Sequence, residues 1–149
     1  MILDVAHLAP PGVRDVLELS EAPVVASHAN ARALCDHPRN LTDEQLEGIA
    51  ASGGLVAVTY VPSFLASPPQ DASLEQVLDH VDYIVKTIGV DHVGLGSDFD
   101  GFGGVLPGLE DVSHLPALTA GLVARGYSDE KVVKILGGNY LRVFRQVAG

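Results

Sequence analysis

Four short segments of apolar, mostly β-branched residues recur along the chain, at residues 1–6, 22–27, 55–60 and 93–96. Strands of a parallel sheet are buried on both faces and are therefore largely apolar, as these segments are. The longer stretches between them repeat apolar residues at helical spacing. The distribution of apolar residues therefore predicts strands that alternate with helices.

Polar residues mark where several of the predicted helices begin. Thr42-Asp-Glu-Gln45 and Ser73-Leu-Glu-Gln76 each have the spacing of a capping box, which predicts a helix start at both places. The first of these helices runs to residue 50 and ends at a pair of glycines. The second carries an apolar face up to residue 85. Further helices are predicted at residues 10–19, 115–124 and 128–147, the last with a break near Gly137.

This alternation predicts an α/β fold with a parallel sheet, whose functional face lies at the carboxyl ends of the strands. Four β/α units make either half of an eight-stranded barrel or a complete small open sheet. No linker divides residues 1–149, so we expect one domain. A half barrel leaves the backbone of both outer strands unpaired. A second copy of the chain, or a missing amino-terminal half, would then have to cover these edges.

Composition narrows the expected partners and compartment. The chain has 149 residues, 47% of them hydrophobic, and a formal net charge of −10. This acidity disfavours nucleic acid and anionic membrane surfaces as partners. Cys35 is the only cysteine, so no internal disulfide forms, and we expect it to pack as a small hydrophobic residue. No signal peptide or membrane segment is evident in the sequence, so we expect a cytoplasmic protein.

Histidines and carboxylates follow the predicted strands directly. His7 and His28 end the first and second strands, and Asp98 follows the fourth. The carboxyl ends of parallel strands meet at one edge of the sheet, and neutral imidazole suits Zn²⁺, so these positions indicate a metal site. The alternative is that each histidine is a hydrogen-bonded structural residue. Asp98 and Asp100 would then only form a turn.

Arg39 lies in the polar loop after the second strand, and its planar guanidinium can grip a carboxylate at two points. The alternative is a surface arginine paired with a nearby acid. The other four histidines lack a strand-end position, and we expect them at the surface or in supporting positions: His37, His80, His92 and His114. No glycine-rich phosphate loop, serine nucleophile elbow or zinc-finger pair of cysteines occurs.

Six segments resemble, in consistent order, the motifs of one family. They are Asp4-Val-Ala-His7, Pro23-Val-Val-Ala-Ser-His28, Cys35-Asp-His-Pro-Arg-Asn-Leu41, Gly96-Ser-Asp-Phe-Asp-Gly101, Gly108-Leu-Glu-Asp-Val112 and Leu136-Gly-Gly-Asn-Tyr-Leu-Arg-Val-Phe144. Over nearly the whole chain, they resemble the membrane (renal) dipeptidase family of zinc metallopeptidases.

The resemblance implies a TIM-like (β/α)₈ barrel of the metal-dependent hydrolase type. Such a barrel hydrolyses dipeptides through a hydroxide that bridges two Zn²⁺ ions. Residues 1–149 would be its carboxyl-terminal half, equivalent to strands 5–8 with the closing helices. His7 and His28 resemble the two histidine ligands of the second zinc. Arg39 resembles the arginine that binds the terminal carboxylate of the dipeptide, and Asp98 the aspartate that transfers a proton to the departing amine.

The chain also departs from the family. The His-x-Asp motif that binds the other zinc, the glutamate that bridges both ions and a further substrate-positioning histidine have no counterpart in the sequence. Met1 aligns with a hydrophobic position inside a family motif, so we expect it to be an internal methionine. Ala6 stands where the family often has Ser, and Thr59-Tyr60 where it often has Asn-Phe.

Three hypotheses follow from these matches and departures. In the first, the chain is the carboxyl-terminal half of a zinc dipeptidase, holds at most one partial zinc site and is inactive alone. In the second, it is a non-catalytic half barrel that self-associates through its strand edges and retains one metal ion. In the third, it is a complete small hydrolase with one metal at His7, His28 and Asp98, although nothing supplies a bridging ligand or a separate base.

Overall fold

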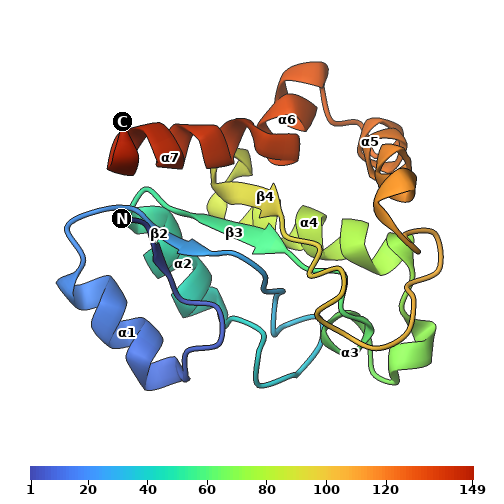
Figure 1. Ribbon diagram of the computed structural model, residues 1–149, viewed down its shortest axis with the longest axis horizontal. Helices are drawn as coiled ribbons and strands as arrows, with labels where there is room; N and C mark the ends of the chain where they lie inside the picture. The colour runs from blue at the N-terminus through green and yellow to red at the C-terminus, as the bar shows by residue number, and fades with distance from the viewer.

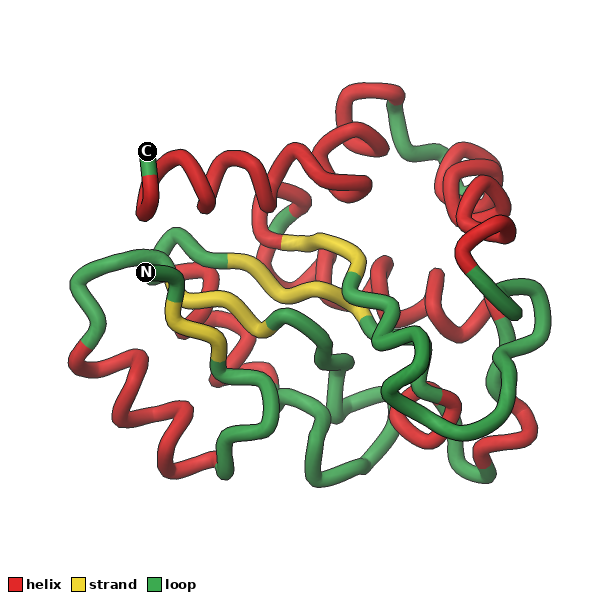
Figure 2. Tube along the Cα trace, in the orientation of Figure 1, coloured by secondary structure: helices red, strands yellow, loops and turns green.

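A sheet of four parallel strands forms the centre of the protein, whose computed structural model describes residues 1–149 (Figure 1). Neighbours in sequence are also neighbours in space, in the order β1-β2-β3-β4 (Figure 2). The strands are β1 Leu3–Asp4, β2 Val24–Ala26, β3 Leu55–Val58 and β4 Val93–Leu95. Parallel strands that are added in one direction form a segment of a barrel wall, so the predicted α/β fold is confirmed.

Helices follow every strand. They are α1 Pro10–Leu19, α2 Asp43–Ala51, α3 Pro62–Leu65, α4 Leu74–Ile88, α5 Leu115–Ala124, α6 Asp129–Val133 and α7 Asn139–Ala148. The predicted break in the last helix is present, because a π-helical turn at Lys134–Gly138 separates α6 from α7. No helix combines the length and the apolar character that a membrane crossing requires.

The two predicted capping boxes differ in the structure. At α2 the box is complete: the Gln45 N–H donates to Thr42 Oγ1, and the Thr42 N–H donates to Gln45 Oε1. At α4 the predicted box is wrong, because neither of its two reciprocal bonds forms. Ser73 Oγ accepts from the Glu75 N–H, but Gln76 Oε1 accepts from the Ser73 hydroxyl and so does not bond the Ser73 N–H. The α4 start therefore has a simple serine cap.

The alternation of side chains along the strands divides the core between two faces of the sheet. Val24 and Ala26 of β2 point into a large cluster that is shared with α1, α2, α4 and α5. Val25, between them, points to the opposite face. Four buried residues and three partly buried ones pack on that face: Val25, Leu55, Ala57 and Val143 with Ile2, Tyr140 and Val147. The second face is thus covered by α7.

The position of α7 leaves the carboxyl ends of the strands free. Asn139 donates to the carbonyls of Val90 and Val93, both at 2.7 Å, just before and at the start of β4. Arg142 donates to the Gly53 carbonyl at 2.7 Å, just before β3. These bonds hold α7 against the amino ends of the strands (Figure 1). Polar side chains at the opposite ends are left for a functional site.

Candidate functional site

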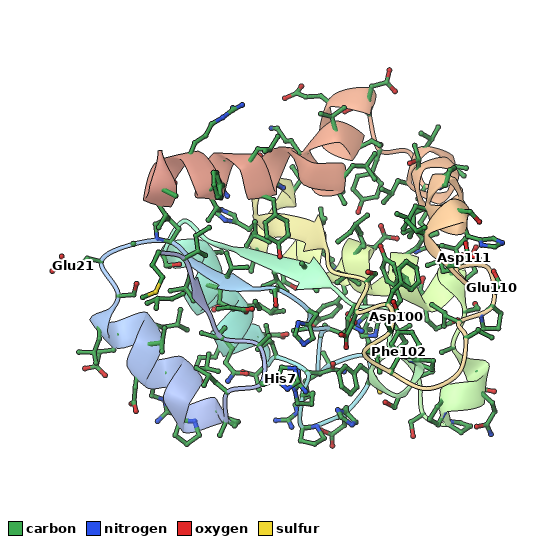
Figure 3. The ribbon with its side chains drawn as sticks, viewed as in Figure 1. His7, Glu21, Asp100, Phe102, Glu110 and Asp111 are labelled. Carbon is green, nitrogen blue, oxygen red and sulfur yellow. The ribbon has the colours of Figure 1, made fainter.

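His7 and His28 lie at neighbouring strand ends, as their sequence positions predict. β1 is shorter than predicted, because the chain leaves the sheet after Asp4 and reverses at His7, whose φ of 71° is left-handed. His28 follows β2 by two residues. Figure 3 labels His7 on the loop between β1 and α1.

The two imidazoles converge on each other. The Nε2 atoms of His7 and His28 are 2.8 Å apart, and the ring centroids are separated by 4.8 Å at an interplanar angle of 60°. Arg39 joins them from the loop after β2. Its Nη1 lies 2.9 Å from His7 Nδ1 and its Nη2 lies 3.4 Å from His28 Nε2. Three of the four predicted site residues are therefore in direct contact.

The donor-only character of Arg39 sets the direction of the hydrogen bonds. A guanidinium cannot accept, so His7 Nδ1 accepts from Arg39 and His7 carries its proton on Nε2. His7 Nε2–H then donates to His28 Nε2, which leaves the proton of His28 on Nδ1. That proton is donated to Ser27 Oγ at 2.8 Å. The chain of bonds requires both imidazoles to be neutral.

The surroundings of His28 keep it neutral. Its pKa is lowered, mainly because burial disfavours the charged imidazolium; the Asp98 carboxylate opposes this shift, and His7 and Arg39 add to it. A neutral ring retains the lone pair that metal ligation needs.

Asp98 lies near this cluster without a hydrogen bond to it. The residue has a left-handed φ of 61°, as Asp100 has at 66°, and the Gly101 N–H donates to the Asp98 carbonyl at 3.0 Å. The segment is thus a tight turn, which the sequence analysis gave as the alternative interpretation of Asp98 and Asp100. A side chain at residue 101 would collide with the Asp98 carboxylate, so glycine leaves that carboxylate room. Asp98 acts on His28 through its charge alone.

Arg39 is not an arginine paired with an acid, since no carboxylate lies within ion-pair distance of it. Its guanidinium carbon lies 5.4 Å from the ring centroid of Phe64, in the range of a cation–π contact. Next to it, Asn40 is buried and donates to the carbonyls of Cys35 and Phe64, both at 2.8 Å. Cys35 is buried, as predicted.

His80 was expected at the surface or in a supporting position, and the structure excludes the surface. It is 1% exposed. Its Nδ1 accepts from the Ala31 N–H at 3.1 Å, and its Nε2–H donates to the Leu65 carbonyl at 3.3 Å. His80 therefore anchors the loop between β2 and α2 that carries Arg39, called the Arg39 loop below. The sequence contains a signal for this burial, because His80 falls between Val77 and Ile84 on the apolar face of α4.

The donor set fits a zinc ion in part. Two neutral imidazoles whose Nε2 atoms lie this close can share one ion, since Zn–N bonds are about 2.0–2.1 Å long. His7 would have to move its proton to Nδ1 first, which requires Arg39 to release that atom. Nowhere does the structure group three or more His, Cys, Asp or Glu side chains as a metal needs. The chain thus offers two ligands of a tetrahedral site.

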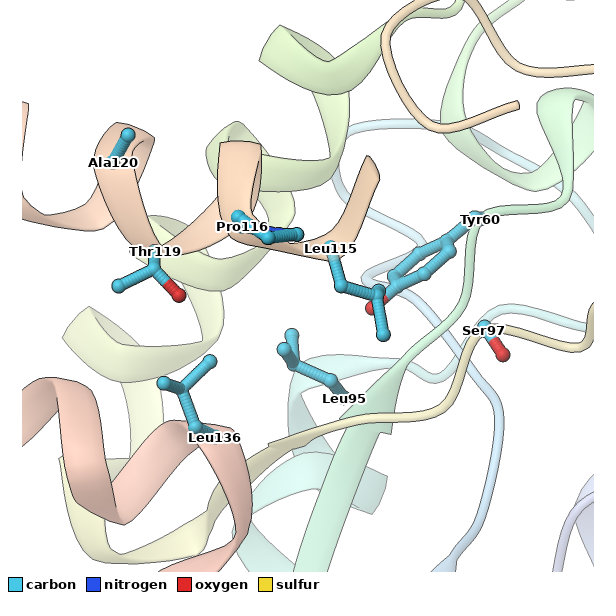
Figure 4. Close-up of a pocket in the computed structure, with 8 residues that line it drawn as sticks. All are labelled: Tyr60, Leu95, Ser97, Leu115, Pro116, Thr119, Ala120 and Leu136. Atoms are coloured by element: carbon cyan, nitrogen blue, oxygen red, sulfur yellow. The ribbon is translucent and has the colours of Figure 1, made fainter. Parts of the chain in front are cut away.

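A separate, mainly apolar cavity of about 690 Å³ lies beside the unpaired edge of β4 (Figure 4). Leu95 of β4, Leu115 of α5 and Leu136 line it, together with Tyr60 and Ser97. None of the histidines, Arg39 or Asp98 reaches it. The cavity borders a sheet edge and not the polar cluster of His7, His28 and Arg39. It is therefore separate from the candidate functional site.

Comparison with known proteins identifies relatives along the entire chain. A family model described as membrane dipeptidase (peptidase family M19) matches residues 1–149. The chain is 42% identical over 147 residues to the dipeptidase tcpJ of Claviceps purpurea (strain 20.1). It is 45% identical over 148 residues to the dipeptidase ataJ of Aspergillus terreus (strain NIH 2624 / FGSC A1156). These matches cover 99% and 98% of the chain but only 35% and 36% of the two relatives.

A solved structure shows the same pattern of coverage. The metallo peptidase from Rhodobacter sphaeroides, liganded with a phosphinate mimic of the dipeptide L-Ala-D-Ala, is 41% identical and superposes with a TM-score of 0.90. The match covers 97% of this chain and 42% of that structure. The chain thus spans about a third of the length of the two curated relatives and less than half of the solved one.

Proposed function

Since the chain belongs to the membrane dipeptidase family of metallopeptidases, we propose that its polar cluster is one half of a zinc dipeptidase site. The observation that carries this proposal is the convergence of His7 Nε2, His28 Nε2 and the Arg39 guanidinium at neighbouring strand ends. Barrel enzymes build their active sites at this end of the strands.

We assign the two histidines to zinc. When bound, zinc supplies an activated water and polarises the peptide carbonyl. His7 and His28 project from adjacent strands, and a lowered pKa keeps His28 neutral and able to ligate. Ser27 Oγ accepts from His28 Nδ1 and so directs the lone pair of Nε2 toward the shared site.

We assign Arg39 to the substrate's terminal carboxylate and Asp98 to proton transfer. The guanidinium presents two N–H groups toward the cluster, which matches the two oxygens of a carboxylate. Phe64 lies against it and limits its movement. Asp98 has no hydrogen-bond partner in the cluster, so its carboxylate is free to carry a proton to a departing amine.

We propose that the 149-residue chain is inactive by itself. It supplies two imidazoles, one guanidinium and one nearby carboxylate, and these cannot complete the coordination of two metal ions. The remaining ligands would come from the amino-terminal half of a barrel, and the partial coverage of the relatives supports a barrel that is longer than this chain.

A second function has its own supporting observation. Both outer strands, β1 and β4, have an unpaired edge, and an apolar cavity lies beside the β4 edge. Unpaired edges pair readily with other strands. The chain would then be a non-catalytic half barrel that binds copies of itself and retains one metal ion.

Zinc stoichiometry and hydrolysis test the first proposal together. We expect the purified chain to bind at most one Zn²⁺ and to hydrolyse no dipeptide, and we expect the variant His28→Ala to lose that zinc. His92→Ala is the matched control, because His92 bonds the Gly54 carbonyl at the opposite end of the strands. Two tightly bound zinc ions with dipeptide hydrolysis would contradict the proposal of an inactive half. Unchanged zinc content in His28→Ala would contradict the assigned ligand.

A further inference from the structure

β1 and β2 are joined by a very short backbone ladder. Two residue pairs align in it, and its last hydrogen bond runs from the Val5 N–H to the Val25 carbonyl at 2.8 Å. Beyond this point, no backbone hydrogen bond fixes the segment that carries His7 against the segment that carries His28. Something other than the ladder must hold the two imidazoles together.

The Asp4 carboxylate joins the two segments where the ladder stops. Its Oδ1 atom accepts from the Ala6 N–H and from the Ser27 N–H, both at 3.0 Å. Ala6 directly precedes His7 in the chain, and Ser27 directly precedes His28. We infer that Asp4 is a positioning residue that holds both histidines where their Nε2 atoms converge, a role that rests on the proposed function.

The backbone of His7 needs this support. Its φ of 71° is left-handed, which is unfavourable for a residue with a Cβ. The Ala6 N–H bonded to Asp4 forms an Asx turn immediately before this reversal. One short side chain therefore fixes both the reversal and its distance from β2.

Ser27 extends the connection to the second imidazole. Its N–H donates to Asp4, and its Oγ lies 2.8 Å from His28 Nδ1. The segment is also confined from the other side, because a Cβ at Gly96 would collide with the Ser27 carbonyl. Asp4 thus acts on His28 through one residue of backbone and one hydroxyl group.

This role requires the oxygen of Asp4 and not its charge. Asp4 is exposed and takes part in no ion pair. Asparagine keeps an acceptor at the Oδ1 position and can point its NH₂ group to solvent. Alanine removes the acceptor that both N–H groups share.

Three variants separate the role from general stability: Asp4→Ala, Asp4→Asn and the matched control Asp111→Ala. Asp111 also uses Oδ1 to accept an N–H, that of Ser113 at 2.8 Å, in an exposed turn away from His7 (Figure 3). Zn²⁺ alone is titrated against a competing chelator, and the histidine ring ¹⁵N spectrum is recorded. We expect Asp4→Ala to weaken zinc binding about 10- to 100-fold and to change the ring signals of His7 and His28. We expect Asp4→Asn and Asp111→Ala to match the unmodified chain in zinc affinity and in the signals of these two rings, while Asp111→Ala changes only the ring of His114, which Asp111 contacts at 3.2 Å.

Amide hydrogen exchange in the unmodified chain gives a test without any variant or metal ion. Ala6 and Ser27 lie outside every helix and strand, yet we expect their N–H groups to exchange slowly. Exchange at the rate of free loop amides would overturn the inference. So would an Asp4→Ala variant with unchanged zinc affinity and ring signals. If the unmodified chain binds no Zn²⁺, the proposed function fails, while the exchange rates still decide the role of Asp4.

Discussion

Among single residues, His80 shows how a buried histidine outside the cluster of His7, His28 and Arg39 holds the loop that carries Arg39. The ring is neutral, since Nδ1 accepts from Ala31 while Nε2–H donates to Leu65. Burial lowers the pKa of His80 to about 4, against 6.5 for an exposed histidine. Protonation of Nδ1 would break the bond to Ala31 and loosen the loop that carries Arg39.

His80 predicts a pH dependence of stability. The unfolded chain binds this proton more readily than the folded chain, so the contribution of His80 is complete above pH 6.5 and is lost as the pH falls toward 4. We expect the free energy of unfolding to fall by up to about 3 kcal/mol across this window on account of His80. Urea titrations at pH 7.5 and 4.5 measure this difference in the free energy of unfolding, and we expect the difference to be smaller in His80→Gln. An equal difference in His80→Gln would contradict this explanation.

At the scale of elements, the start of α2 joins the Arg39 loop to a helix with fixed geometry. Leu41 ends the loop by donating its N–H to the Asn30 carbonyl at 2.8 Å. Thr42 then begins the helix through its reciprocal bonds with Gln45. The helix start thus holds one end of the loop, while Asn40 and His80 hold the rest.

Removal of the cap should destabilise the protein measurably. Thr42→Ala leaves the Gln45 N–H without its acceptor, and we expect a loss of about 1 kcal/mol in the free energy of unfolding. Thr42→Ser keeps the hydroxyl and is the matched control. Chemical denaturation measures both variants. A Thr42→Ala variant as stable as Thr42→Ser would show that the box contributes nothing here.

At the scale of the whole molecule, the sheet ends in two unpaired strands that one chain cannot cover. α7 shields the second face near the amino ends of the strands, but β1 and β4 have no neighbour on their outer sides. Leu3 of β1 is 38% exposed, and Leu95 of β4 borders an apolar cavity. Apolar edges of this kind associate with other strands.

The isolated chain is therefore expected to self-associate. Light scattering after size exclusion should give at least twice the mass of a single chain. Leu3→Lys places a charge on the β1 edge without emptying the core, and we expect it to shift the population toward the monomer. Glu21→Lys introduces the same residue in an exposed loop and should leave the mass unchanged. A stable wild-type monomer would remove the support for self-association.

Much of the arrangement was accessible from the sequence, and the failures have physical causes. Each of the four apolar runs contains one of the four strands, and His7 and His28 follow the first two runs directly. The predicted capping box at Ser73 is wrong because the Gln76 side chain accepts from the Ser73 hydroxyl and not from the Ser73 N–H. For His80 the surface alternative is wrong and the supporting one fits, and its burial could have been predicted from the apolar stripe of α4.

Local periodicity and the parallel sheet were enough to predict the four strands, every helix except α3, their order and the neighbouring positions of His7 and His28. The contacts between side chains from distant parts of the chain became visible in the folded molecule alone. Arg39 meets His7 across 32 positions of sequence and Asp4 meets Ser27 across 23, through side chains whose directions depend on turns that periodicity does not encode. The placement of α7 likewise depends on a long-range hydrogen bond, which Arg142 donates to the Gly53 carbonyl just before β3.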